Sequence, residues 1–370
     1  MNPNTVIVTV GTSLLTNLRG LERKDNRSEI ESELLRFVKQ GEWGQIARKL
    51  QSFEPSERIC GAEINSLDSL QKRAQIQTPP QALHFCISET EDGDILGELL
   101  RLYYSDLHVE IHVIKGLQDQ DHNRFRIIGL RELARTIGKI IRKSGDPSYV
   151  AINATGGYKA QIAVAVLIGQ TLGVGVYYKH ELFNEIIQFP PMPISFDYEL
   201  IGQNGGLLSK FENNETLELE ESQVDAKLRV LLEEVEVDTK KLWALAPIGQ
   251  IYLDGFRQRN PIDKSPPPPA DGKTKPKFRD DHYPKGFPEY VEKVWLENDF
   301  IRSCHSLPYD GQRGIRDREF YVRENDGQIV GEYVDKNNFG ARFGISTTAE
   351  TMAQKTAVVL YLNEKYGTKK

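Results

Sequence analysis

The feature that most constrains the fold is an alternation of short apolar strands with helical segments over the first 200 residues. Runs rich in β-branched and aromatic residues predict strands at residues 5–10, 82–88, 109–114, 149–153 and 174–178. Helical patterns lie between them, at about residues 95–104, 124–142 and 158–172. Strands that alternate with helices are typical of a parallel sheet covered on both faces. We therefore expect an α/β fold with a doubly wound parallel sheet.

Two further segments complete this first domain. The polar stretch from residue 17 to 66 contains two helical candidates and predicts an insertion after the first strand. The apolar stretch 186–196 is interrupted by Pro190-Pro-Met-Pro193. Proline cannot donate to a strand ladder, so this segment is expected to lie at an edge of the sheet or to be split by the prolines.

The rest of the chain differs in style. Residues 215–238 are acidic, and with residues 239–256 they predict a helical connector that ends near a proline-rich linker at 264–273. After it we expect a helix at 287–297, strands at 319–323, 329–334 and 341–346, a hairpin turn at Asn325-Asp-Gly and a last helix at 349–365. The predicted domains are 1–205, a connector at 206–274, and a small α+β domain at 275–370.

Composition excludes several classes of protein. The formal net charge is −6, which argues against a broad basic face that coats nucleic acid. The three cysteines are far apart and form no CxxC pair, so neither a disulfide framework nor a structural zinc site is predicted. No apolar run approaches a membrane span and no signal peptide is evident. We expect a cytoplasmic protein without a membrane partner.

Two turns at strand ends carry the ligand chemistry. Gly11-Thr-Ser-Leu14 follows the first strand, and Thr155-Gly-Gly-Tyr-Lys159 closes another strand and opens a helix. Ligands of open parallel sheets bind beyond the carboxyl ends of the strands, and amides at a helix N-terminus attract phosphate. Neither turn matches GxGxxG or GxxxxGK[ST], which excludes a dinucleotide-dependent dehydrogenase and a P-loop NTPase as leading interpretations. The alternative for each turn is a purely structural role without a ligand.

The strings VTVGTSLLTN (8–17), NATGGYKAQIAVAV (153–166) and VGVYYKHELFNEIIQFPPMPI (174–194) together resemble the CARF domain of CRISPR-associated effector proteins. The resemblance covers roughly residues 1–200 and implies a Rossmann-like fold, a two-fold homodimer and a cyclic oligoadenylate ligand, with cyclic tetra-adenylate as the expected ring. It implies that the ligand is bound by Gly11, Thr12, Ser13, Leu14, Thr155, Gly156, Gly157, Tyr158 and Lys159, with Ser88 and Glu89 as weaker candidates.

Residues 275–370 must be interpreted separately, because CARF domains are joined to several effectors. No Arg-x4–6-His spacing of a HEPN ribonuclease is present in residues 275–370, and Asp271-Gly-Lys273 lies in the linker rather than on a strand of a PD-(D/E)xK nuclease. A winged helix fits the strands and late helix less well. The predicted order of elements, helix–hairpin–strand–helix with arginines on the strands, resembles that of the RelE family of mRNA interferases. The candidate catalytic residues are Arg318, Arg342, Arg316, Arg313, Arg323 and His305, with no metal and no cofactor. Arg318 and Arg342 are the first choices, because both lie at the start of predicted strands, where alternation can aim them into one cleft.

The sequence thus supports two hypotheses. In the first, a cyclic oligoadenylate activates a RelE-like endoribonuclease that cuts mRNA, on the ribosome and without a metal. In the second, the C-terminal domain binds nucleic acid or protein without cutting. Slow degradation of the ligand by the first domain is a third possibility. Ring size, the need for a ribosome and codon preference stay open. For each arginine, a solvated ion pair is the alternative to catalysis.

Overall fold

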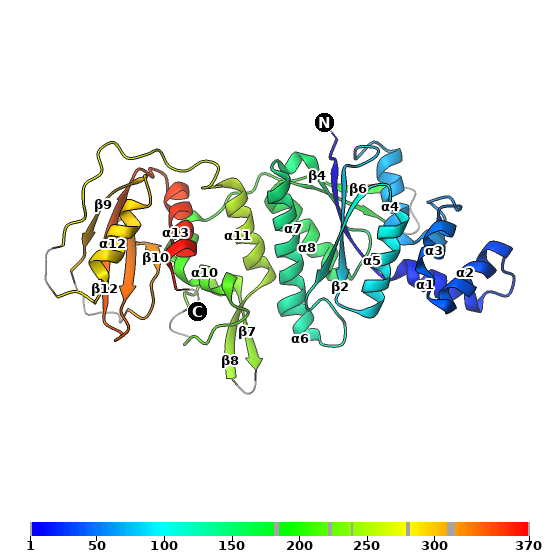
Figure 1. Cartoon of the computed structure of the whole chain (residues 1–370), viewed down its shortest axis with the longest axis horizontal. Helices are drawn as coiled ribbons and strands as arrows, with labels where there is room; N and C mark the ends of the chain where they lie inside the picture. The colour runs from blue at the N-terminus through cyan, green and yellow to red at the C-terminus, as the bar shows by residue number, and fades with distance from the viewer. Residues whose placement is uncertain are drawn as a thin grey trace. The chain divides into compact units, whose positions relative to one another are not determined.

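The chain forms two compact units (Figure 1). The computed structural model describes residues 2–180, 185–220, 224–237, 240–278, 282–308 and 315–368. The first unit is Met1–Ile194 with Ala246–Gly255, and the second is Ser195–Leu245 with Phe256–Lys370. The domain limits predicted at residues 205 and 274 stay predictions about where one function ends and the next begins.

The first unit is built on one six-stranded sheet. Its strands are β1 (Thr5–Thr9), β2 (Ala82–Ser88), β3 (His108–Ile114), β4 (Val150–Asn153), β5 (Gly175–Lys179) and β6 (Ile186–Phe189). Their order is β3-β2-β1-β4-β5-β6, and β1 to β5 run parallel. The segment that precedes the prolines forms β6, an antiparallel edge strand as predicted. This arrangement confirms the mixed α/β prediction and is compatible with a Rossmann-like fold.

Helices cover both faces of this sheet (Figure 1). One face packs against α4 (Gly61–Lys72) and α5 (Glu91–Tyr103), and α1 (Ser13–Gly20), α2 (Glu29–Gln40) and α3 (Trp43–Leu50) extend the same core by packing on these helices and on one another. The other face packs against α7 (Leu130–Ser144), which follows the short α6 (His122–Arg124), and against α8 (Lys159–Leu172). Strand alternation divides the core accordingly: Val6 and Val8 face the first group of helices, and Ile7 faces the second.

The predicted insertion is more helical than expected. Where two helical candidates were predicted between residues 17 and 66, the structure places parts or all of α1 to α4. Leu34 of α2 and Ile46 of α3 are buried in the same core as β1. The segment is therefore an integral layer of the domain rather than a polar appendage.

The second unit has a four-stranded antiparallel sheet. Its strands are β9 (Ile301–Ser306), β10 (Phe320–Val322), β11 (Ile329–Val334) and β12 (Gly340–Thr347), in the order β10-β11-β12-β9. Helices α12 (Phe287–Leu296) and α13 (Met352–Tyr366) share the core with one face of this sheet. The Asn325-Asp-Gly turn joins β10 to β11 and closes with Arg323 N–H donating to the Gln328 carbonyl at 2.8 Å. The small α+β arrangement and its hairpin are confirmed.

The prediction of a helical connector is wrong for residues 232–245, which form two strands. Helices α9 (Tyr198–Gln203), α10 (Gly205–Asn213) and α11 (Pro247–Arg259) are present, but β7 (Leu232–Val237) and β8 (Lys240–Leu245) form an antiparallel hairpin between α10 and α11. Unlike charges oppose each other across it, with Glu236 opposite Lys241 and Lys241 Nζ 2.8 Å from Glu234. Cross-strand pairs of this kind stabilise a hairpin, so they outweigh the helical bias of the acidic run.

None of the helices that the structure describes combines the length and the apolar character that a transmembrane span requires.

Candidate functional site

The two glycine turns meet where β1 and β4 end. These strands are neighbours, with Val8 opposite Asn153, so both chains leave the sheet at the same edge. A Cβ on Gly11 would lie 2.5 Å from the Gly157 nitrogen, and one on Gly156 would lie 2.9 Å from the Gly11 nitrogen. Only glycine permits backbones to approach this closely. The structure therefore brings the two predicted ligand turns together into one surface.

Two groups at this surface are available to an anion. Lys159 is the first residue of the 14-residue helix α8, its side chain is exposed, and no hydrogen bond or ion pair to it is seen within the described residues. Thr12 is also exposed at the end of the first turn. Free amides at the start of a helix add partial positive charge at the same place. Tyr158 lies beside Lys159, with its ring edge-on to Phe125 at 5.1 Å between centroids.

Other residues of the turns already have structural partners. The Ser13 hydroxyl accepts a hydrogen bond from the Ala62 amide at 2.9 Å, and Thr155 Oγ1 donates to Asn153 Oδ1 at 2.7 Å. Leu14 is buried in the core beneath the turn. Its side chain is therefore not in a position to line a pocket, although sequence analysis placed it there. The physical reason is that Leu14 is the second residue of α1 and faces the sheet.

The end of β2 carries the weaker candidates. Ser88 Oγ lies 2.8 Å from Thr90 Oγ1. Glu89 Oε2 accepts from the Gly116 amide at 2.9 Å and from Arg124 at 3.1 Å. The hydrogen bond from Gly116, with the contribution of Arg124, lowers the pKa of Glu89. Glu89 thus stays ionised and ties the loop after β3 to β2.

Sequence reasoning missed the residue that holds the first turn. Glu63 of α4 is fully buried, and its Oε1 accepts a hydrogen bond from the Gly11 amide at 2.7 Å. Its Oε2 is also buried and has no hydrogen-bond partner within the described residues. Burial raises the pKa of Glu63 to about 7. No signal in the sequence marks this glutamate, because it lies in the polar insertion and is separated from Gly11 by fifty residues.

The second unit contains a cavity of about 610 Å³. It takes in the face of the sheet opposite the core, where Tyr321 and Arg342 project, and the adjoining helix α10. The charged residues that line it are four cations and five carboxylates: Lys210, Arg316, Arg323, Arg342, Asp225, Asp317, Glu319, Glu324 and Glu332. Three of the arginines predicted from the sequence therefore share one cavity.

Ion pairs hold most of the cations in the cavity. Arg342 Nε lies 2.7 Å from Glu332 Oε1, and both side chains are nearly buried. Arg323 binds Asp326 at 2.6 Å, which raises the pKa of the arginine. Arg316, by contrast, is exposed and has no ion pair with any described residue. Arg316 is thus the lining arginine most available to an incoming phosphate.

Tyr321 lies between these groups on β10. Burial, with a smaller contribution from Glu332, raises its pKa to about 12. The phenol therefore stays protonated at neutral pH and offers a hydrogen-bond donor to the cavity.

Arg318 faces away from the cavity. Its guanidinium lies 4.6 Å from the ring centroid of Tyr333 and 5.4 Å from that of Tyr290. Arg318 and Arg342 were expected to point into one cleft, and they do not. Arg318 is two residues before the core residue Phe320, whereas Arg342 is directly before the core residue Phe343. Alternation along a strand places the two arginines on opposite faces.

His305 lies on the same sheet face as Arg342. It pairs with Gly344 of β12, two positions from Arg342, and a Cβ on Gly344 would lie 2.7 Å from two atoms of the His305 ring. The histidine is half-buried and is not among the residues that line the cavity. Arg313, also predicted, lies outside the described residues.

Part of the first unit is similar to a known protein family. Residues 58–192 match the model of a family described as CRISPR-associated protein (Cas_APE2256). The matched segment is 135 of the 370 residues and contains β2 to β6 with the Thr155–Lys159 turn. This match supports a CRISPR-associated protein, and at that level it agrees with the resemblance found in the sequence.

Proposed function

We propose that this chain is a type III CRISPR effector that is activated by a cyclic oligoadenylate and cleaves mRNA. The first unit is the sensor, with cyclic tetra-adenylate as the expected ligand. The second unit is a RelE-like endoribonuclease that works without a metal, with the ribosome as its expected partner. The observation that carries the proposal is the meeting of two glycine turns at the start of α8, the second of which lies inside a segment that matches a CRISPR-associated family.

The chemistry of the turns suits a cyclic oligonucleotide. Its phosphodiesters are anions, and the exposed Lys159 and the amides of α8 offer them positive charge. The Tyr158 ring offers an apolar face to a base. A ring with two-fold symmetry suits a homodimer in which each protomer contributes the same turns. Both the ligand and the dimer are part of the proposal.

The cavity of the second unit suits phosphate chemistry on RNA. Cleavage without a metal requires cations around the phosphate and a group that handles the proton of the 2′-hydroxyl. Arg316 supplies an exposed cation, and the Tyr321 phenol supplies a donor. Arg323 and Arg342 are held in place by Asp326 and Glu332. His305, on the same sheet face, is the candidate acid–base group.

Activation requires that the ligand prefer the active arrangement of the protein. A cyclic oligoadenylate that binds this arrangement more tightly shifts the population toward it by the ratio of its two affinities. Nothing more specific about the path of the signal is needed for the proposal.

The test is a cleavage assay with purified full-length protein. A translating ribosome–mRNA complex is incubated with and without cyclic tetra-adenylate, in EDTA, for wild type and for Arg316→Ala and Arg342→Ala. We expect ligand-dependent cuts that each variant reduces by roughly 100-fold, the magnitude seen when one donor to a transition-state anion is removed. The matched control is Arg302→Ala, which removes an exposed arginine of β9 that does not line the cavity.

A binding assay tests the function proposed for the first unit separately from that proposed for the second. We expect Lys159→Ala to weaken binding of cyclic tetra-adenylate by roughly tenfold or more, the value of one charge-assisted hydrogen bond, and the exposed Lys139→Ala to leave it unchanged. Ligand binding without any cut in ribosomal or free RNA would reject the ribonuclease. It would leave the alternative, a ligand-responsive regulator whose second unit binds without cutting. The ion pairs within the cavity favour this alternative, because paired arginines are also typical of a structural sheet face.

A further inference from the structure

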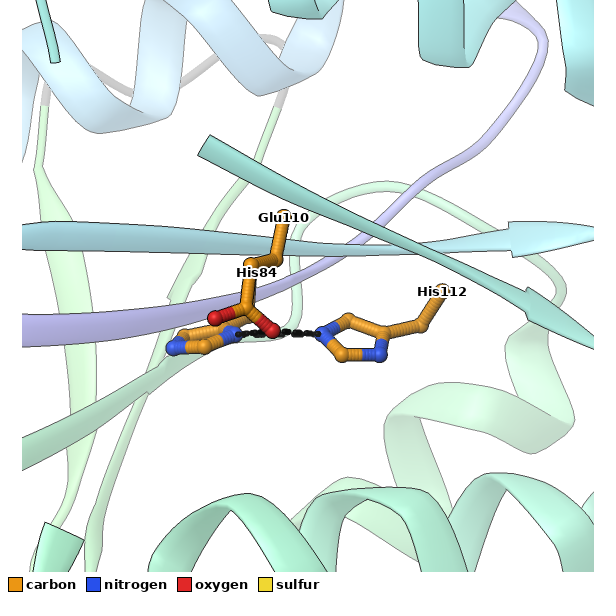
Figure 2. A group of neighbouring side chains, drawn as sticks. All are labelled: His84, Glu110 and His112. Atoms are coloured by element: carbon orange, nitrogen blue, oxygen red, sulfur yellow. Dashed lines mark hydrogen bonds and ion pairs between the residues drawn. The ribbon is translucent and has the colours of Figure 1, made fainter. Parts of the chain in front are cut away.

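Two histidines and a glutamate converge on one face of the sheet in the first unit, away from the glycine turns (Figure 2). His84 lies on β2, and Glu110 and His112 lie on β3. The parallel register places His84 directly opposite Glu110. His112 is two residues further along β3 and so projects from the same face. Figure 2 shows the two imidazoles facing each other, with the Glu110 carboxylate at the gap between them.

The separations of three atoms define the cluster. His84 Nδ1 lies 3.1 Å from His112 Nε2, and Glu110 Oε2 lies 3.6 Å from the first nitrogen and 3.7 Å from the second. The circle through three atoms with these separations has a radius of about 2.0 Å, so one point lies about 2.0 Å from each of them. Zinc binds imidazole nitrogen at about 2.0–2.1 Å and carboxylate oxygen at about 2.0–2.2 Å.

We propose that His84, Glu110 and His112 bind a divalent transition-metal ion, with Zn²⁺ as the first candidate. Two imidazoles and one carboxylate are a donor set that zinc and other first-row metals accept. The side chain of Glu110 is 45 % exposed, whereas that of His84 is 11 % exposed. The site is therefore closed on the side of the sheet core and open beside the carboxylate, where water completes the coordination. The proposal is independent of the ligand and of the ribonuclease proposed above.

Hydrogen bonding within the cluster joins only the two imidazoles. One proton can bridge their nitrogens, which are 3.1 Å apart, whereas the carboxylate oxygen lies 3.6 and 3.7 Å from them, beyond hydrogen-bond distance. A single cation interacts favourably with all three atoms at once.

Two neighbours influence the site. His108 Nε2 lies 3.2 Å from Glu110 Oε1, which orients the carboxylate so that Oε2 points toward the imidazoles. Lys143 of α7 contributes a positive charge near both histidines. Its positive charge opposes a metal ion, and it sets a limit on the affinity.

The metal ion would link the edge strand to its neighbour. β3 is the outermost strand on its side of the sheet and pairs only with β2 among the described strands. A ligand that binds only the folded state stabilises it by mass action. We expect a hundredfold excess of Zn²⁺ over its Kd to raise the unfolding midpoint of the first unit by roughly 5–10 °C.

The test is metal binding by the full-length protein after treatment with EDTA and its removal. Titration with Co²⁺, followed by absorption, and with Zn²⁺, followed by calorimetry, is expected to show one tight site per chain. We expect His112→Ala and Glu110→Gln each to lower the metal affinity by roughly 100-fold or more. Replacing a residue that only hydrogen-bonds to a metal ligand already lowers metal affinity by roughly 10–100-fold. His122→Ala, an exposed histidine of α6, is the control and is expected to bind as wild type does.

Two results would overturn the assignment. One is the absence of a tight Co²⁺ or Zn²⁺ site in the wild type, and the other is a tight site that the variants at His112 and Glu110 both retain. Circular dichroism of each variant verifies folding, and the absence of a tight site in the wild type overturns the assignment even if a variant fails to fold. Retention of ligand binding and RNA cleavage in a variant without the metal would leave the inference intact, because the site is distinct from both.

Discussion

Replacement of Glu63 by glutamine should make the first unit more stable at neutral pH and leave it unchanged in acid. Glu63 is fully buried, and burial raises its pKa from 4.5 to about 7. The folded state therefore holds the proton more tightly than the unfolded state does. Between these two pKa values the unfolded chain releases the proton first, so the stability of the wild type falls as pH rises from about 4.5 to about 7.

The magnitude follows from the two pKa values. Each pH unit between them corresponds to about 1.4 kcal/mol, so the ionised carboxylate costs the folded state about 3 kcal/mol above pH 7. Glutamine has the shape of the protonated acid, and its oxygen can still accept from the Gly11 amide. The Glu63→Gln variant is therefore expected to equal the wild type near pH 4 and to exceed it by about 3 kcal/mol near pH 8.

The assay is urea unfolding between pH 4 and 8, followed by hydrogen exchange in peptides of β1 and β4. These strands report on the first unit alone. His84 and His112, whose pKa values are lowered by burial, give the opposite pH dependence, but they are present in both proteins and cancel in the difference. Glu98→Gln, at an exposed position of α5, is the matched control.

A stability difference that stays constant from pH 4 to 8 would refute the reasoning. It would mean that Glu63 binds its proton equally well in the folded and the unfolded state. In that case the hydrogen bond from the Gly11 amide would offset burial, and the pKa of Glu63 would not be raised.

Two glycine substitutions give further expectations. Gly11→Ala places a Cβ 2.5 Å from the Gly157 nitrogen and should destabilise the first unit by about 1–3 kcal/mol in urea unfolding, whereas Gly20→Ala meets no atom within 4 Å and should be neutral or slightly stabilising. Gly344→Ala places a Cβ 2.7 Å from the His305 ring and should turn that flexible side chain away. Its imidazole NMR signals should shift with a change of less than about 1 kcal/mol in stability, and unshifted signals would contradict the contact.

The fold of the first unit could be predicted because each of its strands is marked locally. β2 was predicted with its observed limits, and the prolines after Phe189 placed β6 at an edge. The hairpin of β7 and β8 could not be predicted in the same way. It depends on partners elsewhere in the chain, since Trp243 pairs with both Glu234 and Leu217. The alternation of Val235 with two glutamates was its only local signal.

The candidate sites were predictable to the extent that one strand or one turn contains them. The two glycine turns were found because the carboxyl ends of adjacent parallel strands must meet. Glu63 was missed because its role depends on how α4 packs against the first turn. Arg318 was assigned to the same cleft as Arg342 because the core face was unknown. Once Phe320 and Phe343 mark that face, alternation alone separates the two arginines.

The histidine–glutamate cluster shows where such local reasoning ends. Residues 110 and 112 alternate along the predicted strand 109–114, so their common face follows from the sequence. The contribution of His84 depends on register, since it meets Glu110 only because these two residues pair across β2 and β3. A slip by one residue would turn His84 to the opposite face. Metal binding at this cluster therefore depends on the pairing of two strands that no local pattern specifies. A Co²⁺ absorption spectrum typical of coordination by two imidazoles would therefore support the register in which His84 pairs with Glu110.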